Sequence, residues 1–279
     1  MGRTNMTRVL TTVLLSLLLS PSLLKGNGNC TVTNFVFKDG EKVTYNAVYN
    51  WGFIWLNAGL VTFSVDSVKK DSKPAYHFKA VGVTHKGYDK LFMVRDTFQS
   101  FVDPISMKPF EFIRSTQEGS YKAYEYYSFD KDKRKINTKI SKEGGAPIYK
   151  TIDWPECGLD IVSLVYYARN LDFSKYKPGD KIPIVMIVDG EVFDLYIRYL
   201  GREEIKTRDG RRFRCLKFTP LLVEGTIFNA GEDMTVWMTD DNARIPILVE
   251  AKILVGSVKA VFVDAQGLRN PITAEILGK

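Results

Sequence analysis

Apolar and polar residues alternate in short runs along most of the chain, and the first clear run covers residues 43–55. One side of this run carries Val43, Tyr45, Ala47, Tyr49, Trp51, Phe53 and Trp55. A period of two places successive side chains on opposite faces of a β-strand, so the run predicts a strand with one strongly aromatic face. We expect a hairpin over residues 41–68 with its turn near Asn57-Ala58-Gly59. A straight strand over 43–55 would be about 40 Å long, so we also expect a bulge or kink at Gly52.

Further strand-like runs follow, and turn residues separate them. They cover residues 75–83, 94–102, 110–117, 121–129, 134–140, 182–188, 192–200, 213–223, 234–238, 247–255 and 258–263. Glu118-Gly119, Asp189-Gly190 and Gly256-Ser257 are typical of tight turns between paired strands. The pattern therefore predicts about twelve to fourteen strands.

One segment has helical periodicity instead. Residues 143–158 are rich in Gly and Pro and read as a loop. In residues 159–171 the apolar positions recur at helical spacing, at Ile161, Leu164, Val165, Ala168 and Leu171. Asp160 is placed to cap the start of this helix, and Arg169 suits the negative end of its dipole.

This order of elements predicts the fold class. Strands and helices do not alternate as in βαβ units, so the protein should be mainly β with an antiparallel sheet. We expect a curved sheet that forms a barrel or half-barrel with the helix packed against it, and a β-sandwich is the alternative.

The N-terminal residues have the features of an export signal. Arg3 and Arg8 precede an apolar core that runs from Val9 to Leu24, and Pro21 and Ser22 interrupt its end. Residues 1–29 therefore read as a signal peptide, and residues 30–279 as a single all-β domain. A membrane anchor is the alternative, but this core is short for a span of about 20 residues. No A-x-A site marks the cleavage position, which we place between Gly26 and Cys30.

This assignment predicts the compartment and leaves one question open about the N-terminus of the mature chain. We expect a periplasmic or cell-envelope location and no transmembrane segment in the mature chain. Cys30 is either an ordinary residue near the cleaved end or a lipid-attachment site. The residue before it is Asn29, where a lipid-attachment site usually has a small residue.

The charge excludes one class of partner. Removing residues 1–29 takes away Arg3, Arg8 and Lys25 and no acidic residue, so the formal net charge falls from +7 to +4. The sequence has no basic block and no interleaving of basic and aromatic residues, so we expect no nucleic-acid partner.

The reactive side chains predict no particular chemistry. The two histidines, His77 and His85, stand alone, and no spacing suggests a metal site. Glycine-rich phosphate or dinucleotide loops and the G-x-S-x-G elbow are missing from the sequence, so no cofactor is expected. Cys157 and Cys215 are either two separate thiols or, in an oxidising compartment, a disulfide. Cys157 also precedes the helix, where the helix N-terminus can lower the pKa of a thiol, so a nucleophile is a third and less favoured interpretation.

Aromatic residues are unusually abundant in the sequence, and two structural roles would explain them. They fill the core under a curved sheet, or they line a cavity for an apolar or sugar ligand. Our candidate lining residues are Trp51, Phe53, Trp55, Tyr166 and Tyr167.

Four segments resemble one known family, the domain of unknown function 3108. They are YNAVYNWGFIWLNAGLVTFSV (45–65), DPISMKPFEF (103–112), GLDIVSLVYYARNLDF (158–173) and VWMTDDNARIPILVEAKILVGSVKAVF (236–262). Their order and spacing cover essentially the whole mature chain. The resemblance implies an exported bacterial protein with a mostly β fold, and it implies no known reaction. The residues at its motif positions are Gly59, Pro109, Asp160, Arg169, Trp237 and Pro246.

Together these patterns favour non-catalytic binding of a hydrophobic or lipid-like ligand in a barrel-like cavity. The first alternative is an assembly or interaction module that binds an envelope protein through an exposed apolar patch or strand edge. A less favoured alternative is a glycan-acting hydrolase, which would need two facing carboxylates in a groove.

Overall fold

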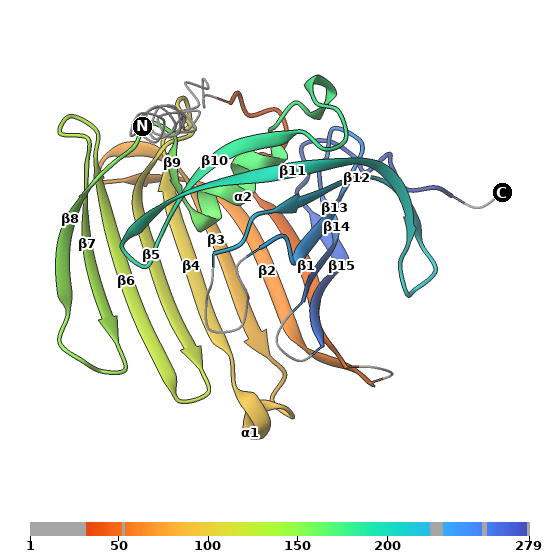
Figure 1. Cartoon of the computed structure of the whole chain (residues 1–279), viewed down its shortest axis with the longest axis horizontal. Helices are drawn as coiled ribbons and strands as arrows, with labels where there is room; N and C mark the ends of the chain where they lie inside the picture. Colours follow the sequence, from red (N-terminus) through yellow and green to blue (C-terminus); the bar gives the residue numbers. More distant parts are fainter. Residues whose placement is uncertain (1–31, 52–53, 224–230, 253–255, 278–279) are drawn as a thin grey trace, which may run out of the picture.

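The chain folds into one large curved sheet that wraps around a helix (Figure 1). The structure is a computed structural model, and it describes residues 32–51, 54–223, 231–252 and 256–277. The described residues contain fifteen strands in a single sheet, in the order β8-β7-β6-β5-β4-β3-β2-β1-β15-β14-β13-β12-β11-β10-β9. The sheet does not close, so the expected half-barrel with a packed helix is confirmed and the two-sheet sandwich is not.

The strand bounds follow the predicted runs closely. The strands are β1 (Glu41–Trp51), β2 (Ile54–Lys70), β3 (Lys73–Thr84), β4 (Arg95–Val102), β5 (Pro109–Glu118), β6 (Tyr121–Asp130), β7 (Lys135–Lys142), β8 (Ile148–Asp153), β9 (Gly158–Asp160), β10 (Lys181–Val188), β11 (Glu191–Lys206), β12 (Arg212–Pro220), β13 (Met234–Thr239), β14 (Pro246–Lys252) and β15 (Ser257–Gln266). Each neighbouring pair is antiparallel except β9 and β10, which are parallel.

The main helix, α2 (Ile161–Arg169), lies in the hollow of the sheet (Figure 1). As predicted, Asp160 caps it by accepting hydrogen bonds from the backbone N–H groups of Val162 (2.9 Å) and Ser163 (3.0 Å). The helix separates two apolar clusters. Val162 and Tyr166 belong to the cluster formed with β2–β7, whereas Leu164, Tyr167, Ala168 and Leu171 pack in the cluster formed with β10–β13. The helix therefore lies between the two clusters and contributes side chains to both.

The first hairpin corrects one prediction. β1 and β2 pair continuously from Glu41 with Val65 to Trp51 with Ile54, so the strands are joined beyond Trp51 and Ile54 and not at Asn57-Ala58-Gly59. The register shifts between Ala47 and Val48, which places a bulge in β2 opposite that point. Gly59 lies within β2, where a Cβ atom would stand 2.1 Å from the Val83 carbonyl oxygen. Glycine is needed there for the close approach of two strands, a requirement that sequence alone does not distinguish from a turn.

Four short elements were not predicted. The segment 143–158, expected to be a loop, contains the edge strand β8 and ends at the start of β9. The one-turn helix α1 (Asp89–Phe92) and a 3₁₀ turn (Phe173–Lys175) also lack a periodic signal. The predicted signal peptide and the predicted kink at Gly52 lie outside the described residues. No helix in the described part of the chain is long and apolar enough to cross a membrane.

Candidate functional site: the concave face of the sheet

The concave face of β2–β7 is a packed aromatic core where α2 covers it. Tyr166 stacks on Phe78, with 4.0 Å between ring centroids, and meets Phe37 edge-on at 5.1 Å. Its hydroxyl donates a hydrogen bond to the Ser64 carbonyl oxygen at 3.2 Å. Phe112 on β5 is fully buried in the same cluster. This end of the concave face has the character of a domain core.

Beyond α2 several positions of the same face are only half-buried. Alternate positions of each strand continue the face, so Phe98 follows Ser100 on β4 and Val61 follows Phe63 on β2. Phe98 lies in register with Ala80 on β3 and with Arg114 on β5. Farther along, the half-buried Tyr49 on β1 pairs with the half-buried Leu56 on β2. The core thus extends into an apolar wall that α2 does not cover.

Charged groups adjoin this wall on β5 and β6. Arg114 Nη1 donates to Glu125 Oε1 at 2.8 Å, and its Nε donates to the Thr116 hydroxyl at 3.0 Å. The guanidinium also lies 5.5 Å from the Phe98 ring centroid. Glu125 is fully buried, and burial raises its pKa. The Tyr127 hydroxyl donates a hydrogen bond to the other oxygen of Glu125.

The turn between β10 and β11 packs onto these groups. The Gly190 backbone N–H donates to the Tyr127 hydroxyl at 2.9 Å. Asp189, beside it, accepts from Lys142 Nζ at 3.0 Å and lies 3.6 Å from Arg114 Nη1. The β10–β11 turn therefore contacts β5–β7, which lie near the other end of the sheet. The contacts are one backbone hydrogen bond and two ionic interactions.

A second acidic group lies on the same face. Asp96 on β4 accepts a hydrogen bond from the Gln117 backbone N–H at 3.1 Å. Burial, and then the nearby Glu118 carboxylate, raise the pKa of Asp96 to about 7. The uncovered end of the face is thus amphipathic, because an apolar wall stands beside Arg114, Lys142 and several carboxylates.

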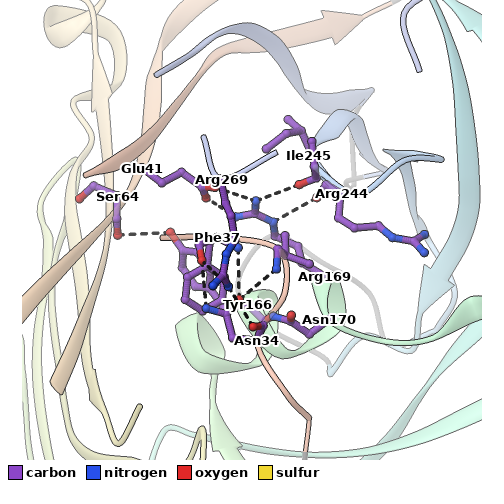
Figure 2. Close-up of polar contacts among 12 residues, drawn as sticks. Asn34, Phe37, Glu41, Ser64, Tyr166, Arg169, Asn170, Arg244, Ile245 and Arg269 are labelled. Atoms are coloured by element: carbon purple, nitrogen blue, oxygen red, sulfur yellow. Dashed lines mark hydrogen bonds and ion pairs between the residues drawn. The ribbon is translucent and has the colours of Figure 1, made fainter. Parts of the chain in front are cut away.

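The buried polar groups of α2 tie the helix to the sheet. Ser100 on β4 donates to Asp160 Oδ2 at 2.7 Å, and Ser163 donates to the same oxygen at 2.6 Å. At the other end, Arg169 pairs with Glu41 of β1 at 2.6 Å (Figure 2). The resemblance placed Asp160 and Arg169 at motif positions, and both hold the fold together. Arg169 lies in the last turn of α2, where it was expected, and is also a buried partner of Glu41.

Comparison with protein-family models identifies the family of this chain. The model for the protein family of unknown function DUF3108 matches residues 43–263. The chain belongs to the DUF3108 family. The suspected resemblance is therefore confirmed, over most of the sequence.

A solved structure shares the fold of this DUF3108 protein. It is a β-barrel-like protein of the domain of unknown function DUF1849 from Brucella abortus. The two are 8% identical, with a TM-score of 0.55, and the match covers 83% of this chain and 98% of the other. At this identity the likeness concerns the fold alone. No curated protein matches the sequence.

The structure brings few of the predicted lining residues together. Tyr166 is buried against Phe78, whereas Tyr167 faces the cluster on the other side of α2. Trp55 is 39% exposed, with Lys259 Nζ 4.7 Å and the Arg208 guanidinium 5.1 Å from its ring. The side chains of Trp51 and Phe53 lie outside the described residues. Phe98, Arg114 and Asp96 were missed, because an alternating strand gives no sign of which positions the helix leaves uncovered.

The cysteine hypothesis needs a correction. Cys215 is a free, buried thiol, and Cys157 is disulfide-bonded, so the Cys157–Cys215 pair does not form. Cys215 lies in a third apolar cluster with Phe213 and Ile245, where burial raises its pKa to about 12. Spacing in the sequence could not reveal this, because the pairing depends on which strands enclose each sulfur.

The remaining reactive residues have structural partners. His77 lies 3.0 Å from Gln99 through its Nε2 and stacks on Phe101 at 4.5 Å. Glu203 binds Lys217 at 2.8 Å and accepts from the Trp237 indole at 3.0 Å. Within the described ranges, no three His, Cys, Asp or Glu side chains are grouped as a metal site would require.

Proposed function

We propose that this DUF3108 protein is exported to the periplasm or cell envelope and binds a hydrophobic or lipid-like ligand without catalysing a reaction. The observation that carries the proposal is the half-buried apolar wall on the concave face beyond α2. Its half-buried side chains are Tyr49, Leu56, Val61 and Phe98, of which Val61 and Phe98 also pack against apolar clusters of the core. Burying such side chains against an apolar ligand contributes about 25 cal/mol per Å² of covered surface.

The polar end of the wall suggests an amphipathic ligand. Arg114 lies against the Phe98 ring and is held in place by Glu125 and Thr116. A ligand with an apolar chain and a polar head can place its chain on the wall and its head near Arg114 and Lys142. Binding sites of this kind are mostly apolar with a few fixed polar groups, which this face reproduces.

The reactive groups elsewhere in the described part of the chain also favour binding over chemistry. The buried Cys215 thiol has a raised pKa, so little thiolate forms near neutral pH. Glu203 and Asp240 line a groove on β11–β13, where a hydrolase would need free carboxylates. Each is already paired, Glu203 with Lys217 and Asp240 with Arg202 at 2.7 Å.

Ligand binding can be measured on protein purified after export, together with the mass of its N-terminus. Native mass spectrometry should find an apolar ligand that organic solvent extracts, and a fluorescent fatty acid should then bind the extracted protein. Leu56→Ser and Phe98→Ala should each weaken that binding about tenfold, since each removes one apolar side chain from the wall. Ile105→Ser is the matched control, because Ile105 is 89% exposed in the β4–β5 turn.

Two results would count against the proposal. One is a bare protein mass with no fatty-acid binding after extraction. The other is equal binding by the Leu56→Ser, Phe98→Ala and control proteins, each shown to be folded by its thermal transition. An N-terminus that retains residues 1–29 would contradict the export part alone.

A further inference from the structure

The strand ends opposite α2 form a continuous rim. Figure 1 shows α1 at this end, beside the ends of β2–β7. Backbone hydrogen bonds join the neighbouring segments: His85 N–H to the Ala58 carbonyl at 2.9 Å, Gly119 N–H to the Met93 carbonyl at 2.7 Å, and Glu143 N–H to the Lys122 carbonyl at 2.7 Å. We call the surface formed by Trp55, residues 85–93, residues 118–124 and residues 142–150 the α1 rim.

Large apolar side chains are exposed on the α1 rim. They are Trp55 (39%), Phe92 (55%), Tyr124 (39%), Ile148 (60%) and Tyr149 (70%). Exposed apolar groups gathered on one surface mark interaction sites more often than single exposed residues do. Aromatic rings dominate this set, and Trp and Tyr are the side chains favoured at a membrane–water boundary.

Lysines surround these apolar groups. Lys86, Lys90, Lys122 and Lys150 are exposed, and none of them forms an ion pair with a described residue. Arg208 and Lys259 lie over the Trp55 ring, and Lys259 is itself paired with Glu250 at 2.9 Å, so Arg208 alone adds to this charge.

The acidic groups of the rim offset this charge only in part. Asp89 is neutralised by Arg95 at 2.7 Å, and Glu118 and Glu143 remain. The rim therefore presents more positive than negative charge around its apolar side chains.

We infer that the α1 rim docks onto the surface of a membrane that contains anionic lipids. Its aromatic side chains insert into the headgroup region of the membrane. Its lysine ammonium groups bind the anionic headgroups, and the aliphatic parts of the lysine side chains pack on the apolar groups of the rim. A protein partner fits less well, because lysine is depleted at the centre of protein interfaces. The inference does not depend on ligand binding, although it would place the uncovered end of the concave face next to the membrane.

Vesicle co-sedimentation tests the inference with the exported protein. One set of vesicles is pure phosphatidylcholine, and the other contains about 30 mol% phosphatidylglycerol. We expect binding to the anionic vesicles and its loss as salt rises from about 0.05 to about 0.5 M. Lys86→Gln and Lys90→Gln should each weaken binding about fivefold. Phe92→Ser and Tyr149→Ser should also weaken vesicle binding, and the ratio of their affinity to that of the unaltered protein should be the same at every salt concentration.

The opposite strand ends provide matched controls. Lys131→Gln removes an exposed lysine of the β6–β7 turn that, like the rim lysines, forms no ion pair with a described residue, and Ile105→Ser removes the exposed apolar side chain of the β4–β5 turn. These variants should bind as the unaltered protein does. Equal binding to both vesicle types, no binding to either, or equal losses in rim and control variants would each overturn the inference. Capture of a protein through the rim without vesicle binding would overturn it too.

Discussion

Arg169 and Glu41 form a buried, two-pronged ion pair between the end of α2 and the start of β1 (Figure 2). Arg169 Nη1 donates to Glu41 Oε1 at 2.6 Å, and Nη2 donates to Oε2 at 3.2 Å. The remaining donors reach the carbonyl oxygens of Arg244 (3.1 Å) and Ala243 (3.2 Å). One side chain thus joins α2, β1 and the segment before β14, which lie far apart in the sequence.

Breaking this pair should destabilise the fold strongly. Arg169→Met leaves the Glu41 carboxylate buried without its partner, and Glu41→Leu leaves the guanidinium in the same state. We expect each to lower the free energy of unfolding by about 3–5 kcal/mol, measured by urea denaturation. The double variant should lose clearly less than the sum of the two, because it buries no lone charge. Additive losses would show that the pair is not a unit.

Cys215 should be unreactive until the protein unfolds. Its thiol is fully buried, and burial, followed by nearby Asp241, raises its pKa to about 12. Little thiolate exists below pH 9, so a thiol reagent such as dithionitrobenzoate should react only in denaturant. Cys215→Ala should abolish the signal that appears on unfolding. Rapid labelling of the native protein would show that the Cys215 thiol is open to solvent.

Gly59→Ala should test the close approach of β2 and β3. A Cβ at this position would meet the Val83 carbonyl oxygen at 2.1 Å and Thr84 Cα at 2.9 Å, both backbone atoms that cannot move alone. We expect a loss of about 2 kcal/mol or more in unfolding free energy. Gly87→Ala is the control, since nothing lies within 4 Å of its added carbon. Equal stability of both variants would mean that β2 and β3 separate easily.

Much of the fold could be predicted because strands and helices leave periodic signals. The alternation on β3–β7 and the cap at Asp160 correspond to contacts that the structure contains. β8 gave no such signal, since nearly all its residues are exposed on both faces. The first turn was misplaced because Gly59 was read as a turn residue. Glycine is required there because β3 passes too close to β2 for a Cβ atom.

The candidate site was much harder to predict. Tyr166 and Tyr167 are adjacent in sequence, yet the helix directs them into different clusters. An aromatic residue on the concave face is buried where α2 covers it and half-buried where α2 does not. The local sequence of a strand does not contain this information. Arg114 and Glu125 likewise read as ordinary strand charges until the register places them side by side.

Asp96 should make stability depend on pH. Its pKa is about 7 in the folded protein, because of burial and the Glu118 carboxylate, against 3.8 for an ordinary aspartate. Between these values the folded state binds a proton that the unfolded state does not, so this group lowers stability as pH rises from about 4 to about 7. Above pH 8 both states are ionised, and the loss is complete. Asp96→Asn keeps an acceptor for the Gln117 N–H and removes the titration.

The variant should therefore gain stability relative to the unaltered protein across this window, and the gain should level off above pH 8. Urea midpoints measured from pH 4 to pH 9 give this difference directly. Glu118→Gln should shift the window to lower pH, since it removes the second cause of the raised pKa. Asp132→Asn, in the exposed β6–β7 turn, should leave the profile unchanged. A constant difference between Asp96→Asn and the unaltered protein at every pH would mean that Asp96 titrates as an ordinary surface carboxylate, and that the concave face is open to water at this position.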